Sequence, residues 1–182
     1  ADLMKWAHAA GAGAADALYV NGESISVAQR MGAREKLESS EGHDLGLRVF
    51  IGQRQAFVSS TDFAPSSLRI LAQRAVDMAR AVPEDPVCGI APEELLATHW
   101  PDLDLYERKR PTAKSLLAMA AEAEDAARAV RGVTNSEGAE AAWGRSSFVL
   151  ATSNGFSGTY GRSGYSLSCA VLAGEGTGME HD

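Results

Sequence analysis

Residues 45–60 have the sequence LGLRVFIGQRQAFVSS, and this stretch decides the fold class. Aliphatic side chains occupy alternate positions in its first half: Leu45, Leu47, Val49 and Ile51. A period of two predicts a strand with one aliphatic face, because successive side chains of a strand point to opposite sides. Gly52-Gln53 then predicts a tight turn into a second strand from Gln55 to Ser60. The stretch is therefore typical of an antiparallel hairpin.

The residues before this hairpin predict more strands and one short helix. Residues 18–20 and 24–27 have strand character and are separated by Asn21-Gly22, which marks either a turn or a bulge in one long strand. Met31-Gly32 predicts a bend before a polar stretch at 35–41. Small and apolar residues at helical spacing predict a helix over about residues 3–15.

Two long amphipathic helices are predicted to pack on these strands. The first begins after Asp62, has Pro65 in its first turn and carries an apolar stripe over residues 68–79. The second runs from about Thr112 to Val130. Its expected inward-facing residues are Leu116, Leu117, Ala120, Ala127 and Val130. Residues 82–111 hold all but one of the prolines and predict an irregular connection, with one helical turn within 93–98.

Strands resume at Val133 in the second half of the chain. Residues 147–152 and 156–160 predict a hairpin whose Asn154-Gly155 connection is a type I′ turn. Residues 161–164 are expected to form a loop, and alternation over 165–171 predicts a last strand. Regular strand–helix–strand alternation is absent, which favours an α+β fold of antiparallel sheets with the two helices packed on them. The element order also admits two similar halves, each a helix followed by strands.

Composition excludes several classes of function. The 182 residues suit one domain or two small lobes, and the net charge of −7 offers no basic surface for nucleic acid. No run of 18 apolar residues predicts a membrane span. Cys88 and Cys169 lie in unrelated settings, which favours a reduced, cytoplasmic chain, with one disulfide as the alternative. Both ends look cut, so the chain is expected to be a fragment.

Motifs of catalysis are missing from the sequence. The 4 histidines are far apart and form neither HExxH nor HxH, and no GxSxG is present. We therefore predict no catalytic residue and no metal ligand in this chain.

Polar and glycine-rich blocks at residues 134–138, 153–158 and 173–176 are the sharper signal. They indicate turns and strand ends, and such edges can bind a peptide as an added strand. Asn135, Glu137, Asn154 and Phe156 are the candidate peptide-binding residues, because they combine polar groups that can contact a backbone with an aromatic anchor. Ordinary turn chemistry is the alternative.

These blocks also carry a family resemblance. Residues 46–50 (GLRVF), 134–138 (TNSEG), 153–158 (SNGFSG) and 178–180 (GME) resemble the N-terminal domain of the TldD/PmbA family, once called modulator of DNA gyrase. The likeness is greatest to its PmbA (TldE) branch. It implies a bacterial or archaeal cytosolic zinc metallopeptidase in which TldD and PmbA subunits associate and degrade unfolded peptides.

The resemblance places the chemistry outside this chain. In that family a His-Glu-x-x-x-His helix of the TldD subunit binds the zinc, and no residue here matches it. We expect residues 1–182 to be an N-terminal domain without its C-terminal domain, in a non-catalytic PmbA-type subunit. Its partner would be a TldD-like subunit or a second copy, with unfolded peptide as substrate and zinc held elsewhere. The alternatives are an active TldD-type subunit and a peptide-binding or regulatory module unrelated to proteolysis.

Overall fold

The computed structural model describes residues 2–174, 176–178 and 180–181, and it confirms the α+β fold class. The strands form one six-stranded sheet in the order β3-β2-β1-β4-β5-β6. Their bounds are β1 Ala14–Arg30, β2 Ala33–Ile51, β3 Arg54–Ser60, β4 Val133–Thr152, β5 Ser157–Ala173 and β6 Glu180–His181. The helices are α1 Asp2–Ala10, α2 Pro65–Ala81 and α3 Ala113–Arg128, with 3₁₀ turns η1 Glu93–Leu95 and η2 Gly176–Gly178.

The chain divides into two compact units that share its long strands. The first unit holds the residues up to Asn21, then Gly42–Leu103 and Ser147–Gly161. The second holds Gly22–Glu41, Asp104–Ser146 and the residues from Arg162 onward. β1, β2, β4 and β5 therefore each contribute one segment to the first unit and one to the second.

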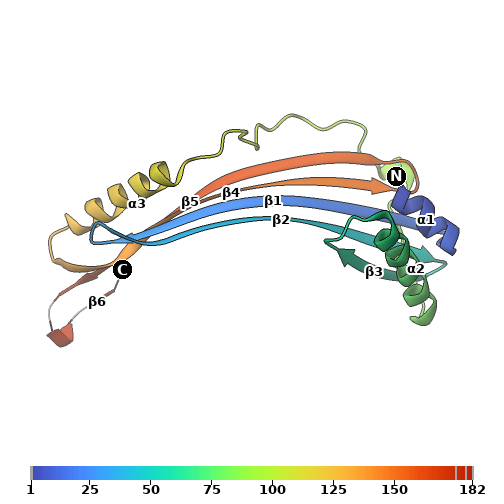
Figure 1. Cartoon of the computed structure of the whole chain (residues 1–182), viewed down its shortest axis with the longest axis horizontal. Coiled ribbons are helices and arrows are strands. Elements are labelled where there is room, and N and C mark those ends of the chain that lie inside the picture. The colour runs from blue at the N-terminus through green and yellow to red at the C-terminus, as the bar shows by residue number, and fades with distance from the viewer. Residues whose placement is uncertain (1, 175, 179, 182) are drawn as a thin grey trace. The chain divides into compact units, whose positions relative to one another are not determined.

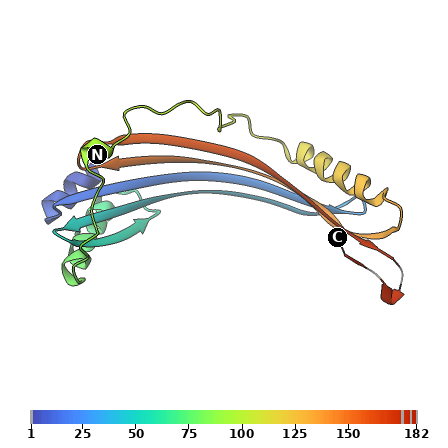
Figure 2. The same cartoon turned by 180° about the vertical axis from the view of Figure 1, so that it is seen from behind.

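The first unit is built around the hairpin of residues 45–60, as predicted. β2 and β3 pair antiparallel, with Leu47 opposite Val58. α1 and α2 lie together beside β3, which Figure 1 and Figure 2 show from opposite sides. Both helices pack on the aliphatic face of the hairpin and on the start of β1. The buried core consists of Leu3, Ala7, Ala12, Ala15, Leu47, Val49, Ala56, Val58, Leu71, Ala72, Ala75, Val76 and Ala79.

Local sequence explains the position of α2. Pro65 occupies the first turn, where its missing N–H costs nothing, and the Asp62 carboxylate accepts a hydrogen bond from the Ala64 N–H (2.9 Å). Small residues on the inner face allow close approach to the strands. Near the end of α2, Arg80 donates to the Ala10 carbonyl at the end of α1 (2.9 Å). This bond satisfies an acceptor that the end of α1 leaves open.

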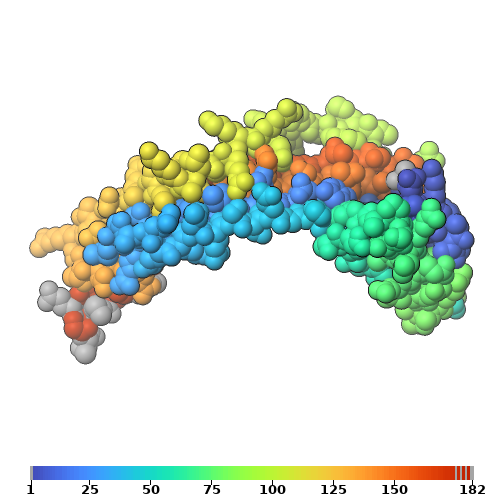
Figure 3. Space-filling model, viewed as in Figure 1, coloured from blue at the N-terminus to red at the C-terminus, as the bar shows by residue number. Residues whose placement is uncertain are grey.

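The second unit is built around α3. Thr112 caps the helix: its hydroxyl accepts from the Ser115 N–H and the Ser115 hydroxyl accepts from the Thr112 N–H. α3 covers a core formed by Ile25, Val27, Ala139, Ala141 and Trp143 together with its own Leu116 and Ala120. The space-filling view shows α3 (yellow) seated directly on the neighbouring strands (Figure 3).

The prediction that Val130 faces the core of this unit is wrong. α3 ends at Arg128, so Val130 lies beyond the helical stripe and is 60% exposed. Glu124 lies on the same inner face of α3 as Leu116 and Ala120, and it is fully buried.

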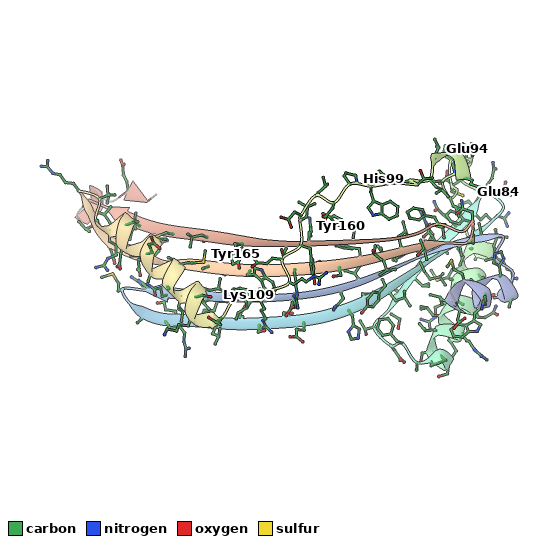
Figure 4. All side chains as sticks on the ribbon, turned by 90° about the horizontal axis from the view of Figure 1, so that it is seen from above. Glu84, Glu94, His99, Lys109, Tyr160 and Tyr165 are labelled. Atoms are coloured by element: carbon green, nitrogen blue, oxygen red, sulfur yellow. The ribbon has the colours of Figure 1, made fainter. Side chains whose placement is uncertain are left out.

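The connection between α2 and α3 is irregular, as predicted, and contains η1. Its last part, which we call the crossing segment (residues 105–110), is bound to successive strands of the second unit. Ser163 of β5 donates to the Leu105 carbonyl (2.8 Å), and Arg145 of β4 donates to the Arg108 carbonyl (2.8 Å). Arg110 reaches the Ser39 hydroxyl of β2 (2.9 Å). Figure 4 labels Lys109 on this segment and Tyr165 on β5.

The strands settle one alternative left open by the sequence and correct two expectations. Residues 18–20 and 24–27 belong to one strand, β1. Residues 161–164 lie inside β5 and form no loop, and the crossing segment binds the strand at Ser163. The type I′ turn is also elsewhere. Such a turn needs positive φ at both central residues, and Met31 (52°) and Gly32 (80°) meet this condition whereas Asn154 does not.

Candidate functional site

Asn154 and Phe156 lie in the turn between β4 and β5, in the first unit. The turn is closed by the Thr152 N–H, which donates to the Phe156 carbonyl (2.9 Å). The Asn154 amide nitrogen donates to the Ala91 carbonyl (2.9 Å), so this side chain ties the turn to the α2–α3 connection. The half-buried Phe156 ring meets the Trp100 ring edge to face, at 6.4 Å between centroids. The Phe156–Trp100 pair thus lies beside a turn in which the Asn154 side-chain amide already donates a hydrogen bond to Ala91.

Asn135 and Glu137 lie near the start of β4, in the second unit. The Asn135 side-chain oxygen accepts a hydrogen bond from the Ser136 N–H (2.8 Å). Glu137 is exposed, and Ser136 between them is fully buried. The candidate residues therefore form two pairs, one in each unit. Met179 and Glu175, which belong to the sequence blocks discussed above, lie outside the described residues.

A β-bulge shapes the strand at this point. Ser136 and Ala139 are both buried, although three positions separate them and regular alternation would place them on opposite faces. Gly138 supplies the extra residue with φ of 110°. A side chain here would collide with the neighbouring strand, because a Cβ would lie 2.6 Å from the Gln29 carbonyl oxygen. The position therefore requires glycine.

Behind the bulge lies the buried carboxylate of Glu124. Its oxygens accept from the Ser136 hydroxyl (2.6 Å), the Met31 N–H (2.8 Å) and the Gln29 amide nitrogen (3.0 Å). Burial alone would raise the pKa of Glu124, but hydrogen bonds from Ser136, Met31, Gln29 and Gly32 outweigh it and hold the pKa below its ordinary value. The group is therefore an anion at neutral pH.

Sequence reasoning did not find Glu124, although a signal for it exists. Leu116, Ala120 and Glu124 are spaced four apart and so share one face of the helix. A carboxylate on an apolar stripe indicates a buried polar partner.

A second polar cluster holds the crossing segment. Glu23 of β1 forms ion pairs with Arg145 and with Arg110 (3.4 Å to the latter), and its side chain is 14% exposed. The Arg145 guanidinium lies over the rings of Tyr106 and Trp143, at 5.8 and 5.6 Å from their centroids. These contacts join a β1 carboxylate, a β4 guanidinium and the crossing segment into one network.

Ligands for a metal ion do not gather among the described side chains: no group of three or more His, Cys, Asp or Glu residues could hold one. The described helices include none long and apolar enough to cross a membrane. Cys88 and Cys169 are free thiols. Burial, and secondarily the charge of Glu124, raises the pKa of the Cys169 thiol.

Comparison with known families decides the identity. The family model described as PmbA/TldA metallopeptidase domain 1 matches residues 15–79, and the one described as the PmbA/TldA metallopeptidase central domain matches residues 106–182. The chain belongs to the PmbA/TldD family. The resemblance carried by the polar blocks is thereby confirmed.

Curated relatives within the PmbA/TldD family are longer than this chain. It is 36% identical to Metalloprotease PmbA of Escherichia coli and 31% identical to a Metalloprotease PmbA homolog of Haemophilus influenzae. Each alignment covers 87% of this chain and 35% of the relative. The chain thus spans about a third of the length of the curated relatives it matches.

Solved structures of family members share the fold. A Bacteroides thetaiotaomicron protein whose structure is described as that of a modulator of DNA gyrase superposes with a TM-score of 0.87 at 22% identity, over 98% of this chain and 41% of that one. TldE from Thermococcus kodakarensis gives a TM-score of 0.82 at 13% identity, over 98% of this chain and 40% of that one. At these identities the likeness establishes the fold alone.

Proposed function

We propose that residues 1–182 form the N-terminal part of a non-catalytic, PmbA-type subunit of a cytoplasmic zinc metallopeptidase that degrades unfolded peptides. The observation that carries the proposal is the 36% identity to Metalloprotease PmbA over 87% of this chain. The described residues supply no metal-ligand set, so they do not fit a zinc site. Zinc would be held by a TldD-like partner or by a C-terminal domain. This chain would then contribute assembly and peptide contacts.

Peptide contact is assigned to the two candidate pairs. Glu137 is exposed beside the β4 bulge, and Phe156 offers a half-buried ring paired with Trp100. β4 lies between β1 and β5 in the sheet, so its main chain is already paired and a peptide would be held there by side chains. Asn154 contributes by fixing its turn through Ala91, and Asn135 by fixing the backbone at Ser136.

The activity is tested with the full-length protein and a TldD-like partner. We expect the pair to cleave an unfolded peptide and a chelator to abolish cleavage, with neither result for the full-length protein alone. Cleavage by the pair that resists the chelator would overturn the metallopeptidase assignment. Cleavage by the full-length protein alone would show that it is an active TldD-type subunit.

The peptide contacts are tested by substitution in the same pair. Phe156→Ala should weaken binding of a fluorescent unfolded peptide, whereas Phe57→Ala, at a 61% exposed ring of the same unit, should leave binding unchanged. Equal effects of the two substitutions would remove Phe156 from the peptide site. A full-length pair that binds no peptide would leave only the assembly role.

A further inference from the structure

The carboxylate of Glu124 joins parts of the second unit that are far apart in sequence. It belongs to α3, yet it binds Gln29 and Met31 at the β1–β2 turn and Ser136 at the bulge of β4. The turn and α3 lie side by side in both ribbon views (Figure 1, Figure 2). Glu124 therefore fixes the β1–β2 turn and the β4 bulge from a single point.

Ser136 transmits this restraint to the residues beside it. Its hydroxyl donates to Glu124 and accepts from the Gly138 N–H (2.9 Å). Its carbonyl accepts from the Arg30 guanidinium (2.8 Å), and its N–H donates to the Asn135 side chain (2.8 Å). Both the backbone and the side chain of Ser136 are thus held. Glu137 follows Ser136 directly in the chain, so the fixed backbone of Ser136 restricts the directions in which the Glu137 side chain can point.

A carboxylate suits this position better than its amide. Met31, Gly32, Gln29 and Ser136 all present donors to Glu124, and an ionised carboxylate is an acceptor on both oxygens. Glutamine at this position would turn an NH₂ group toward some of these donors. The position therefore favours an anion that cannot itself reach solvent, since Glu124 is fully buried.

We propose that Glu124 is a positioning residue: by holding the β1–β2 turn and Ser136 together, it sets the geometry of the β4 bulge and thereby the peptide affinity of Asn135 and Glu137. The inference rests on the proposed peptide contact of this strand. Glu124 itself touches no peptide, because α3 and the strands enclose it. Its influence has to pass through Ser136.

The test uses Glu124→Gln in the full-length protein with its partner, with Glu122→Gln as matched control at an exposed position of the same helix. Glu124→Gln should speed hydrogen exchange at the Met31 and Gly138 amides and weaken binding of a fluorescent unfolded peptide by about fivefold. The control should change neither. If Glu124→Gln does not fold, Ser136→Ala serves as the second variant, because it removes the transmitting hydroxyl and leaves the carboxylate.

A double-substitution cycle separates positioning from general stability. The effects of Glu124→Gln and Glu137→Gln on peptide affinity should be non-additive, whereas those of Glu124→Gln and Phe156→Ala should add, because Phe156 lies in the other unit. Unchanged exchange at Gly138, or additive effects with Glu137→Gln, would overturn the inference. If the unaltered pair binds no peptide, the proposed peptide contact fails, and exchange at Gly138 alone then decides whether Glu124 positions the strand.

Discussion

Replacing Gly138 by alanine tests the β4 bulge directly. A Cβ at this position would cost free energy in two ways, through the positive φ and through the close neighbour, and comparison with Gly132 separates them. Gly138 has φ of 110°, and a Cβ there would lie 2.6 Å from the Gln29 carbonyl oxygen. Gly132 has a similar φ of 98°, but a Cβ there would meet nothing within 4 Å. Gly164→Ala is the baseline, since that position has neither positive φ nor a close neighbour.

The expected magnitudes follow from these contacts. Holding alanine in a sparsely populated φ region costs about 2 kcal/mol, which is the full effect expected for Gly132→Ala. A backbone carbonyl cannot rotate away as a flexible side chain can, so overpacking adds roughly another 2 kcal/mol at Gly138. Gly138→Ala should therefore destabilise the protein by about 4 kcal/mol, and Gly164→Ala by less than about 0.5 kcal/mol.

Urea unfolding followed through Trp143 fluorescence measures these changes. Trp143 is the tryptophan of the α3 core, and Trp6→Phe and Trp100→Phe substitutions in the background make it the sole reporter. If Gly138→Ala and Gly132→Ala differ by less than about 0.5 kcal/mol, the close approach of Gln29 is not what demands glycine. The account of the bulge would then be refuted.

Three further predictions concern the second unit. Glu124 has a folded-state pKa below its unfolded value of about 4.3, so its contribution to stability is complete above that pH and is lost as the pH falls through the folded pKa. Urea unfolding followed as the pH is lowered below the unfolded pKa should show a larger loss of stability in the unaltered chain than in Glu124→Gln. Arg145→Gln should release the crossing segment and speed tryptic cleavage after Arg108 and Lys109 about tenfold, measured by mass spectrometry. Glu124→Gln should also speed alkylation of Cys169 at neutral pH, because the lost negative charge lowers the thiol pKa.

A specific outcome would contradict each of the three predictions on the second unit. The pH prediction fails if acid destabilises Glu124→Gln as much as the unaltered chain, and Glu122→Gln is the control that should match the unaltered chain. The cleavage prediction fails if Arg34→Gln, at an exposed position of the same unit, accelerates trypsin as much as Arg145→Gln does. The alkylation prediction fails if Cys169 reacts at the same rate in both proteins.

Local patterns predict those elements whose side chains face one environment along their whole length. The alternation over residues 45–60 predicts the β2–β3 hairpin, and the structure pairs Arg48 with Phe57 as a tight turn at Gly52-Gln53 requires. The apolar stripe over residues 68–79 likewise predicts α2. In these segments propensity, burial and turn chemistry agree, so a single sequence suffices.

Features that depend on a distant segment could not be predicted in this way. Met31 adopts positive φ, which is unusual for its residue type, and its N–H is bound by Glu124 from a helix 93 residues away. The Gly138 bulge is set by the close approach of Gln29. Of the candidate peptide site, sequence located Asn135 and Asn154 at strand ends and turns. It did not reveal that their side chains already bind Ser136 and Ala91.

The strand order has a consequence for synthesis of the protein on the ribosome. β1 lies between β2 and β4 in the sheet. The Ala15 N–H of β1 donates to the Ser153 hydroxyl, just after the end of β4, and Ser153 is synthesised 138 residues after Ala15. At ribosomal rates of about 5–20 residues per second, one edge of β1 stays without its partner for roughly 7–30 s. An unpaired strand edge is a template for aggregation. The nascent chain therefore has a defined interval in which a chaperone would protect it.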